Sequence, residues 1–273
     1  MAFTESSNFW EEQKLNHLLD NMEEPPTSLE VRLYQGVPEE AGTTVNDVTV
    51  FLNNPGVVTF DAPLPVGDGY QIANSAVVDF GTAADDVNVD HVALWANISG
   101  GWQMIAYTAL SSQITFLDGD PATINAGEIK VTMQENWGAT VQQTLLNWIR
   151  GTIPTSPTDL YVALYTAAPG AGGGGTEVTN NIRSTGRPQP AEVDMERWNE
   201  PVAAAPYFQI TNKGKIDFGA SDNNLASDIT HVGIFDAISG GNLLMWGILS
   251  EPLPVLQGDR VFFEPGQLVL RAA

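Results

Sequence analysis

Apolar residues recur at helical spacing in two places along the chain. In each stripe they follow one another at intervals of three and four, which predicts an amphipathic helix. The first stripe consists of Leu15, Leu18, Leu19 and Met22, and the second of Val141, Leu145, Leu146 and Ile149. Two candidate capping boxes precede them, Asn8 with Glu11 and Thr140 with Gln143. Pro25-Pro26 and Gly151 are the expected stops.

After each helix the apolar period changes to two, which predicts strands. Leu29, Val31 and Leu33 alternate with polar neighbours, whereas residues 160–165 are apolar on both sides and predict a more central strand. Further strands are expected at 48–52, 57–60, 70–73, 76–80, 91–96, 102–109, 113–116 and 128–133, with counterparts in the second half. Many short strands with Gly and Pro turns predict a mainly β protein with two antiparallel β-sandwich or barrel-like domains, each preceded by one helix.

The second half of the chain repeats the first. Residues 29–34, 70–81 and 91–101 reappear in the same order as 160–165, 208–219 and 231–241, and Gly119-Asp120 reappears as Gly258-Asp259. Several matched blocks in one order indicate a tandem duplication. We therefore expect one domain at 1–135 and a second at 139–273.

A long loop is expected in the second copy. Leu29 and Leu160 are 131 positions apart, but Tyr70 and Phe208 are 138 apart, so about seven residues are added within about 166–207. This segment holds a glycine run and five prolines, and such connections are often functional surface loops. We expect it to be an assembly contact that is mobile in the isolated chain and ordered by a neighbouring subunit. The candidate contact residues are Arg183, Arg187, Met195 and Trp198.

Composition excludes several classes of partner. Among 273 residues, 33 are acidic and 11 basic, so the net charge of −22 repels nucleic acid and anionic membranes. No apolar run is long enough to span a bilayer, and the polar start does not resemble a signal peptide. The absence of cysteine excludes disulfides and thiol chemistry and is typical of folding in a reducing cytosol.

The titratable residues favour structure over catalysis. His91 and His231 share one repeated position before an apolar run, where a packed, hydrogen-bonded histidine is the better interpretation than a base or ligand. His17 is matched by Trp148, which also favours packing. Asp79 and Asp217 each precede Phe-Gly, which suits the capping of a turn.

Known catalytic and metal-binding motifs are absent from the sequence. Residues 86–90 resemble the start of a calcium loop but lack its glycine and its closing glutamate. The glycine run at 172–175 is not followed by the Lys-Ser/Thr of a phosphate-binding loop. We expect no enzyme, no cofactor and no metal.

The second copy as a whole resembles a known family. The motifs, in order, are Leu145-Leu146-Asn147-Trp148-Ile149, Leu160-Tyr161-Val162-Ala163-Leu164-Tyr165, Gly175-Thr176-Glu177-Val178 and His231-Val232-Gly233-Ile234-Phe235. This succession resembles small virion proteins of tailed bacteriophages, commonly labelled tail fibre or minor tail proteins. The first copy resembles them through Leu-x-Val-x-Leu-Tyr and His-Val-x-Leu-Trp.

The resemblance implies a non-enzymatic virion structural protein, made in the host cytoplasm. It would be a tail or fibre component, or a decoration (cement) protein of the capsid, and it would contact capsid or tail subunits and form a homo-oligomer. A host-surface glycan-binding adhesin is the alternative, with exposed aromatic residues and the loop at 166–207 as its receptor site.

Overall fold

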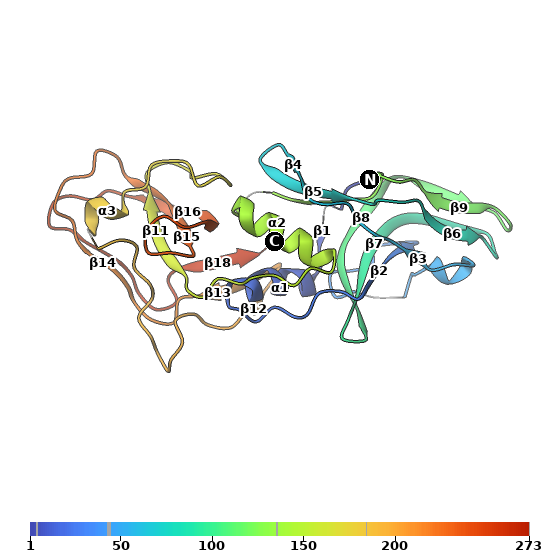
Figure 1. Ribbon diagram of the computed structural model, residues 1–273, viewed down its shortest axis with the longest axis horizontal. Coiled ribbons are helices and arrows are strands. Elements are labelled where there is room, and N and C mark those ends of the chain that lie inside the picture. The colour runs from blue at the N-terminus through green and yellow to red at the C-terminus, as the bar shows by residue number, and fades with distance from the viewer. Residues whose placement is uncertain (4, 43–44, 135, 184, 273) are drawn as a thin grey trace.

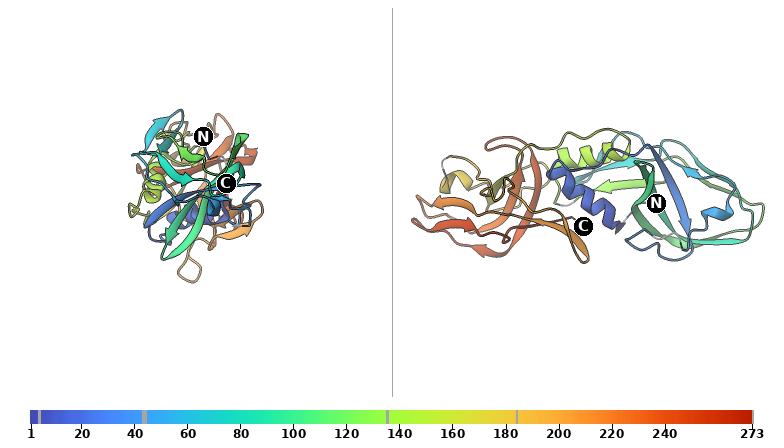
Figure 2. Two further views of the ribbon diagram at one scale, coloured as in Figure 1. Left: turned by 90° about the vertical axis from the view of Figure 1, so that its right-hand side faces the viewer. Right: turned by 90° about the horizontal axis from the view of Figure 1, so that it is seen from below.

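The protein is an elongated, mainly β molecule. The computed structural model describes residues 1–3, 5–42, 45–134, 136–183 and 185–272. Figure 1 shows the strands of the first half at the right, those of the second half at the left, and helices α1 and α2 between them. The right-hand view in Figure 2 shows the same end-to-end arrangement, whereas the left-hand view looks along the long axis, so that the two halves overlap.

The first repeat pairs a large sheet with two smaller ones, and all of them are antiparallel and open. The large sheet has the order β1-β8-β7-β2-β3, and the smaller ones are β10-β5-β4 and β6-β9. The strands are β1 (Glu5–Ser6), β2 (Ser28–Tyr34), β3 (Gly56–Val57), β4 (Leu64–Val66), β5 (Gly69–Ala73), β6 (Val78–Thr82), β7 (Val87–Ile98), β8 (Gly101–Phe116), β9 (Pro121–Ile124) and β10 (Lys130–Met133).

The strands that the two repeats share have the same order, which confirms the tandem duplication. Its sheets are β11-β15-β16, β12-β13-β18 and β14-β17, which match β2-β7-β8, β4-β5-β10 and β6-β9. The strands are β11 (Tyr161–Tyr165), β12 (Val202–Ala204), β13 (Tyr207–Thr211), β14 (Ile216–Ala220), β15 (Ile229–Phe235), β16 (Leu243–Leu253), β17 (Arg260–Phe263) and β18 (Val269–Ala272). Two expectations are wrong. Residues 48–52 contain the 3-10 turn η1 (Thr49–Phe51) and not a strand. The strand expected to be more central, β11, lies at the edge of its sheet, whereas β2 lies between β7 and β3.

The helix α1 (Asn8–Leu18) is capped one residue earlier than expected. Ser7 is the capping residue, and its Oγ accepts a hydrogen bond from Trp10 N at 3.1 Å. The expected box of Asn8 with Glu11 is therefore wrong, and Glu11 instead accepts a bond from Phe208 N at 3.2 Å. The helix ends at Leu18, so Met22 of the predicted stripe lies beyond it.

The helix α2 (Ala139–Ile149) begins at Gly138 without a side-chain cap, so the expected box of Thr140 with Gln143 is also wrong. A Cβ at Gly138 would lie 1.7 Å from the carbonyl oxygen of Leu243, which only glycine tolerates. Gly151 stops the helix as predicted, with φ of 87°.

The two helices are exchanged between the repeats. Helix α1 packs on β13 and β18 of the second repeat, and α2 packs on the matching β5 and β10 of the first. Each also contacts the long strand of its own repeat, β8 for α1 and β16 for α2. The apolar cores of the two halves consequently merge into one cluster, which includes Leu15, Ile72 and Ile210.

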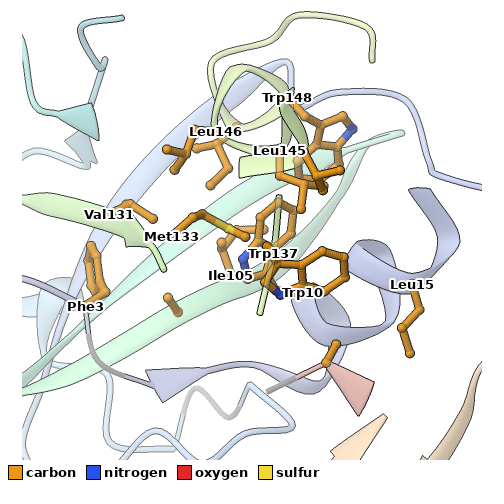
Figure 3. Packing of buried hydrophobic residues seen from close by; sticks show 14 of the residues in the cluster. Phe3, Trp10, Leu15, Ile105, Val131, Met133, Trp137, Leu145, Leu146 and Trp148 are labelled. Atoms are coloured by element: carbon orange, nitrogen blue, oxygen red, sulfur yellow. The ribbon is translucent and has the colours of Figure 1, made fainter. Parts of the chain in front are cut away.

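Two tryptophans form the centre of this junction (Figure 3). Trp10 of α1 and Trp148 of α2 stack with ring centroids 5.3 Å apart. The indole N–H of Trp148 donates to the Glu23 carbonyl at 2.8 Å, so its polar atom is satisfied. The aromatic contact therefore joins the two exchanged helices directly.

Helix α1 is buried on nearly every side and carries polar residues into the junction. Glu11, Lys14 and His17 are all buried. Burial raises the pKa of Glu11 to about 7 and lowers the pKa of His17 to about 4. His17 Nδ1 has no hydrogen-bond partner among the described residues.

Replacing His17 with Leu is expected to stabilise the protein increasingly as the pH falls from 7 to 5. The folded pKa of about 4 lies below the ordinary 6.5, so the unfolded chain takes up the proton first and stability is lost on acidification. The His17→Leu variant lacks this loss and should gain about 2 kcal/mol between these pH values relative to the natural chain. Urea unfolding of both proteins at both pH values measures this difference. If the unfolding free energies of the two proteins changed equally between pH 7 and 5, the lowered pKa of His17 would be contradicted.

A buried asparagine holds a corner in each repeat. Asn74 Nδ2 donates to the carbonyls of Ala76 and Asn125, and its Oδ1 accepts from Ile129 N. Asn212 makes the same bonds in the second repeat, with Gly214, Glu264 and Leu268 as its partners, at 2.8, 2.8 and 2.9 Å. One amide therefore satisfies three main-chain groups that burial would otherwise leave unpaired.

The Asn212→Ala variant is expected to lose about 2–3 kcal/mol of unfolding free energy, because buried main-chain groups lose their partners. The exposed Asn199, which bonds Thr211 Oγ1, provides the control variant Asn199→Ala. Chemical denaturation compares the two, and equal losses would show that the corner is not needed.

Candidate functional site

The segment expected to be an assembly contact runs from the end of β11 to β12. It contains the glycine run, the short helix α3 (Thr179–Ile182) and a hairpin whose turn is bridged from Val193 to Glu196. Ser184 lies outside the described residues.

The added residues of the second repeat can now be located. Thr49 and Thr179 are equivalent, because each hydroxyl accepts from the matching leucine N–H, Leu33 or Leu164. Phe60 and Trp198 are also equivalent, since they bridge to Asn74 and Asn212. These anchors are 11 positions apart in the first repeat and 19 in the second, so eight residues are added between 179 and 198. The glycine run precedes them and is not part of the insertion.

Arg187 is buried within the second repeat and is 7% exposed. Its Nε and one terminal nitrogen donate to the carboxylate of Glu177 at 3.0 and 2.7 Å. The other terminal nitrogen donates to the carbonyls of Ala237 and Gly240, and the guanidinium lies 3.4 Å from the ring centroid of Phe235. The bidentate pair joins two parts of the segment, and the bonds to Ala237 and Gly240 attach it to the turn between β15 and β16.

The first repeat builds a similar group from a different backbone position. Arg32 on β2 lies 4.4 Å from the ring centroid of Trp95 and 3.9 Å from the carboxylate of Asp47. Asp47 and Glu177 are equivalent, because they bridge to the matching tyrosines Tyr34 and Tyr165. Both repeats thus place a cation on an aromatic ring beside a buried tyrosine and an acid.

The other three candidate residues have different surroundings. Arg183 donates from one terminal nitrogen to the Asp217 carbonyl at 3.1 Å. Trp198 is buried in the core. Met195, in contrast, is 95% exposed at the tip of the inserted hairpin. The structure does not gather the four into one patch, so the predicted assembly contact now depends on Met195.

The inserted hairpin is held by contacts to its own repeat. Arg197 pairs with Glu192 at 2.7 Å, and Lys213 pairs with Glu196 at 2.6 Å. Ala191 N donates to the Lys215 carbonyl at 2.8 Å. Asp194 and Met195 have φ of 55° and 66°, which places both in the left-handed region of a tight turn. These contacts hold the hairpin in place, so that Met195 is exposed at the tip of a fixed turn.

The repeated histidines and aspartates have local roles. His91 Nδ1 lies 2.7 Å from the carboxylate of Asp90, and His231 Nδ1 lies 2.8 Å from the Thr230 hydroxyl. Asp79 and Asp217 accept from the N–H of Gly81 and Gly219 at 2.8 and 2.9 Å. Both bonds lie within a strand, β6 or β14, at an irregularity of the strand register, so the expected capping of a turn is wrong. In the described ranges, His, Asp and Glu side chains do not gather in threes that could hold a metal ion.

Sequence reasoning missed Glu177 as the partner of Arg187. The signal was the match of Asp47-Val48-Thr49 to Glu177-Val178-Thr179, which places an acid before Val-Thr in both copies. Such a short match becomes meaningful once the hydrogen bonds of both threonines are known.

Comparison with known proteins identifies a family. The family model described as "Podophage GP4 fiber I protein gp80" matches the chain twice, over residues 5–132 and 136–271. No curated protein sequence matches the chain. Within the described residues, every helix is too short or too polar to cross a membrane.

Proposed function

The chain belongs to the podophage GP4 fiber I protein gp80 family, and on that premise we propose that it is a non-enzymatic structural component of the phage fibre. It is made in the host cytoplasm and resides in the virion, where it contacts other virion proteins. The family match to each repeat carries this proposal. A net charge of −22 supports an exterior position, because it keeps the protein away from packaged DNA.

The inserted hairpin is the proposed assembly contact. Its supports are the exposure of Met195 and the ion pairs that hold the hairpin in place. A thioether on a braced turn can insert into an apolar recess of a neighbouring subunit, either a virion protein or a second copy of this chain.

Virion incorporation tests this contact. Phage carrying Met195→Asp is expected to incorporate at least tenfold less of the protein than natural phage. Ile153→Asp, which changes another exposed apolar residue of the second repeat, should leave incorporation unchanged. Equal incorporation of both variants would remove the hairpin as a contact and leave the fibre role intact.

Copy number tests the fibre role itself. Quantitative mass spectrometry of purified virions is expected to find a few to a few dozen copies per particle. Hundreds of copies would instead identify a capsid decoration protein.

A second candidate function is the binding of a host-surface glycan. One observation favours it: the second repeat has a polar pocket beside the pair of Arg187 and Glu177. Pockets with a few convergent polar groups and an apolar wall are typical of small-ligand sites.

A further inference from the structure

We propose that the pocket of the second repeat binds one neutral saccharide unit. The proposal rests on the glycan-binding candidate above and gives it a location and a ligand class. The pocket lies between the glycine run, the start of α2 and the turn that joins β15 to β16, and its volume is about 320 Å³. That volume lies at the lower end of the range for small-molecule sites, which matches a single sugar rather than a long chain.

The walls combine polar groups with a small apolar surface. Thr140, Tyr165, Glu177 and Asn242 supply hydroxyl, carboxylate and amide groups, while Phe235 and Leu243 supply apolar surface. The Thr140 hydroxyl lies 3.4 Å from Asn242 Oδ1, a long bond that a ligand hydroxyl can replace. The Tyr165 phenol is protonated at neutral pH and can donate, and burial raises its pKa further, to about 12.

The charges of the pocket favour a neutral ligand. Arg187 is already paired with both carboxylate oxygens of Glu177 and with two carbonyls, so its donors are largely used within the protein. The pair is neutral as a unit, and the net charge of −22 repels anions. A ligand rich in hydroxyl groups can form hydrogen bonds with the Thr140 hydroxyl, the Tyr165 phenol and Asn242 Oδ1 without adding charge to the pocket.

The first repeat has larger side chains at the place that corresponds to this pocket. There Trp95 and Met104 occupy the positions of Phe235 and Leu243. A Cβ on Gly42 would lie 3.2 Å from Met104 Cβ and 3.4 Å from the Trp95 ring, so the loop packs closely on these side chains. At the matching Gly173 the nearest atom would be Leu243 Cβ at 3.7 Å. The second repeat therefore keeps the same scaffold but has smaller side chains, Phe235 and Leu243, at these two positions.

Saturation-transfer NMR on the full chain tests the site. The probes are glucose, galactose, mannose, rhamnose, N-acetylglucosamine and N-acetylgalactosamine, with glucuronate as the acidic comparison. At least one neutral sugar is expected to bind saturably. Phe235→Trp, which introduces the larger side chain that the first repeat has at this position, should weaken that binding at least tenfold, and Thr140→Val should weaken it about threefold. Phe262→Trp, the same change at a partly exposed position on β17, should leave it within twofold.

Each result has a distinct meaning. Neutral-sugar binding that both Phe235→Trp and Thr140→Val leave unchanged would overturn the pocket and keep the glycan-binding candidate. If none of the sugars bound, both the pocket as a saccharide site and the glycan-binding candidate would be overturned. Tighter binding of glucuronate than of any neutral sugar would overturn the ligand class. Circular dichroism and thermal unfolding of each variant verify that the fold is kept.

Discussion

Expressed separately, residues 1–135 and 136–273 are expected to fail to form stable monomers, and on mixing they should form a 1:1 complex. Each half lacks the helix that covers one of its sheets, α2 on β10-β5-β4 or α1 on β12-β13-β18. Without α2 the first half exposes Ile72 and Val131, and without α1 the second exposes Ile210 and Leu270, all of which are buried in the intact chain. Contiguous apolar surface of this kind drives association or unfolding.

Light scattering after gel filtration, together with far-UV circular dichroism, measures this result. The intact chain, monomeric or not, provides the reference spectrum. A half that is folded and monomeric, with cooperative unfolding, would show that the domains expected at 1–135 and 139–273 are independent after all.

The Trp148→Ala variant is expected to lose about 3–5 kcal/mol of unfolding free energy, the usual cost of truncating a fully buried aromatic side chain. Three interactions disappear together: the stack on Trp10, the bond to the Glu23 carbonyl and the packing of α2 in the shared core. Trp102→Ala, on the partly exposed face of β8, is the matched control and should cost much less.

A double-mutant cycle with Trp10→Ala isolates the stack itself. We expect a coupling of about 1 kcal/mol between the two rings. Additive losses would show that the rings are buried side by side without a specific interaction between them.

The sequence predicted the duplication and the matched strands because these are recorded in local pattern. Residues 91–101 and 231–241 keep their order and spacing, and they form β7 and β15 in equivalent places. The exchange of the helices was not predictable in this way. An apolar stripe such as that of Leu145 and Ile149 shows that a helix face is buried, but it does not say which sheet covers it.

The helix starts were predicted wrongly for a related reason. Capping depends on which nearby groups compete for the first N–H bonds, and Ser7 and Gly138 are favoured by tertiary contacts. Ser7 also donates to the Met104 carbonyl of β8, and Gly138 lies against the Leu243 carbonyl of β16. Contacts between residues that are far apart in the sequence produce no local pattern from which the capping residue could be predicted.

The interpretation of Arg187 as an outward contact had the same weakness. A basic residue in an acidic chain suggests an intermolecular partner, yet Glu177, ten positions earlier, lies within 3 Å of it. The exposed hairpin, by contrast, followed from counting positions between the copies, since added residues usually lie on the surface.

The exchanged helices also bear on how such a molecule can arise. A polypeptide with only one repeat would have to exchange its helix with that of a second, identical protomer. It would therefore exist as a two-fold symmetric homodimer, whose population falls on dilution. Joining the two repeats in one chain makes their association intramolecular, so that it no longer depends on protein concentration. In a single chain the two repeats can also differ in sequence, so that the contacts on the two sides of the former two-fold axis need not be identical. Trp10 faces Trp148 on one side of the former axis, while Val141 and His17 occupy the corresponding positions on the other.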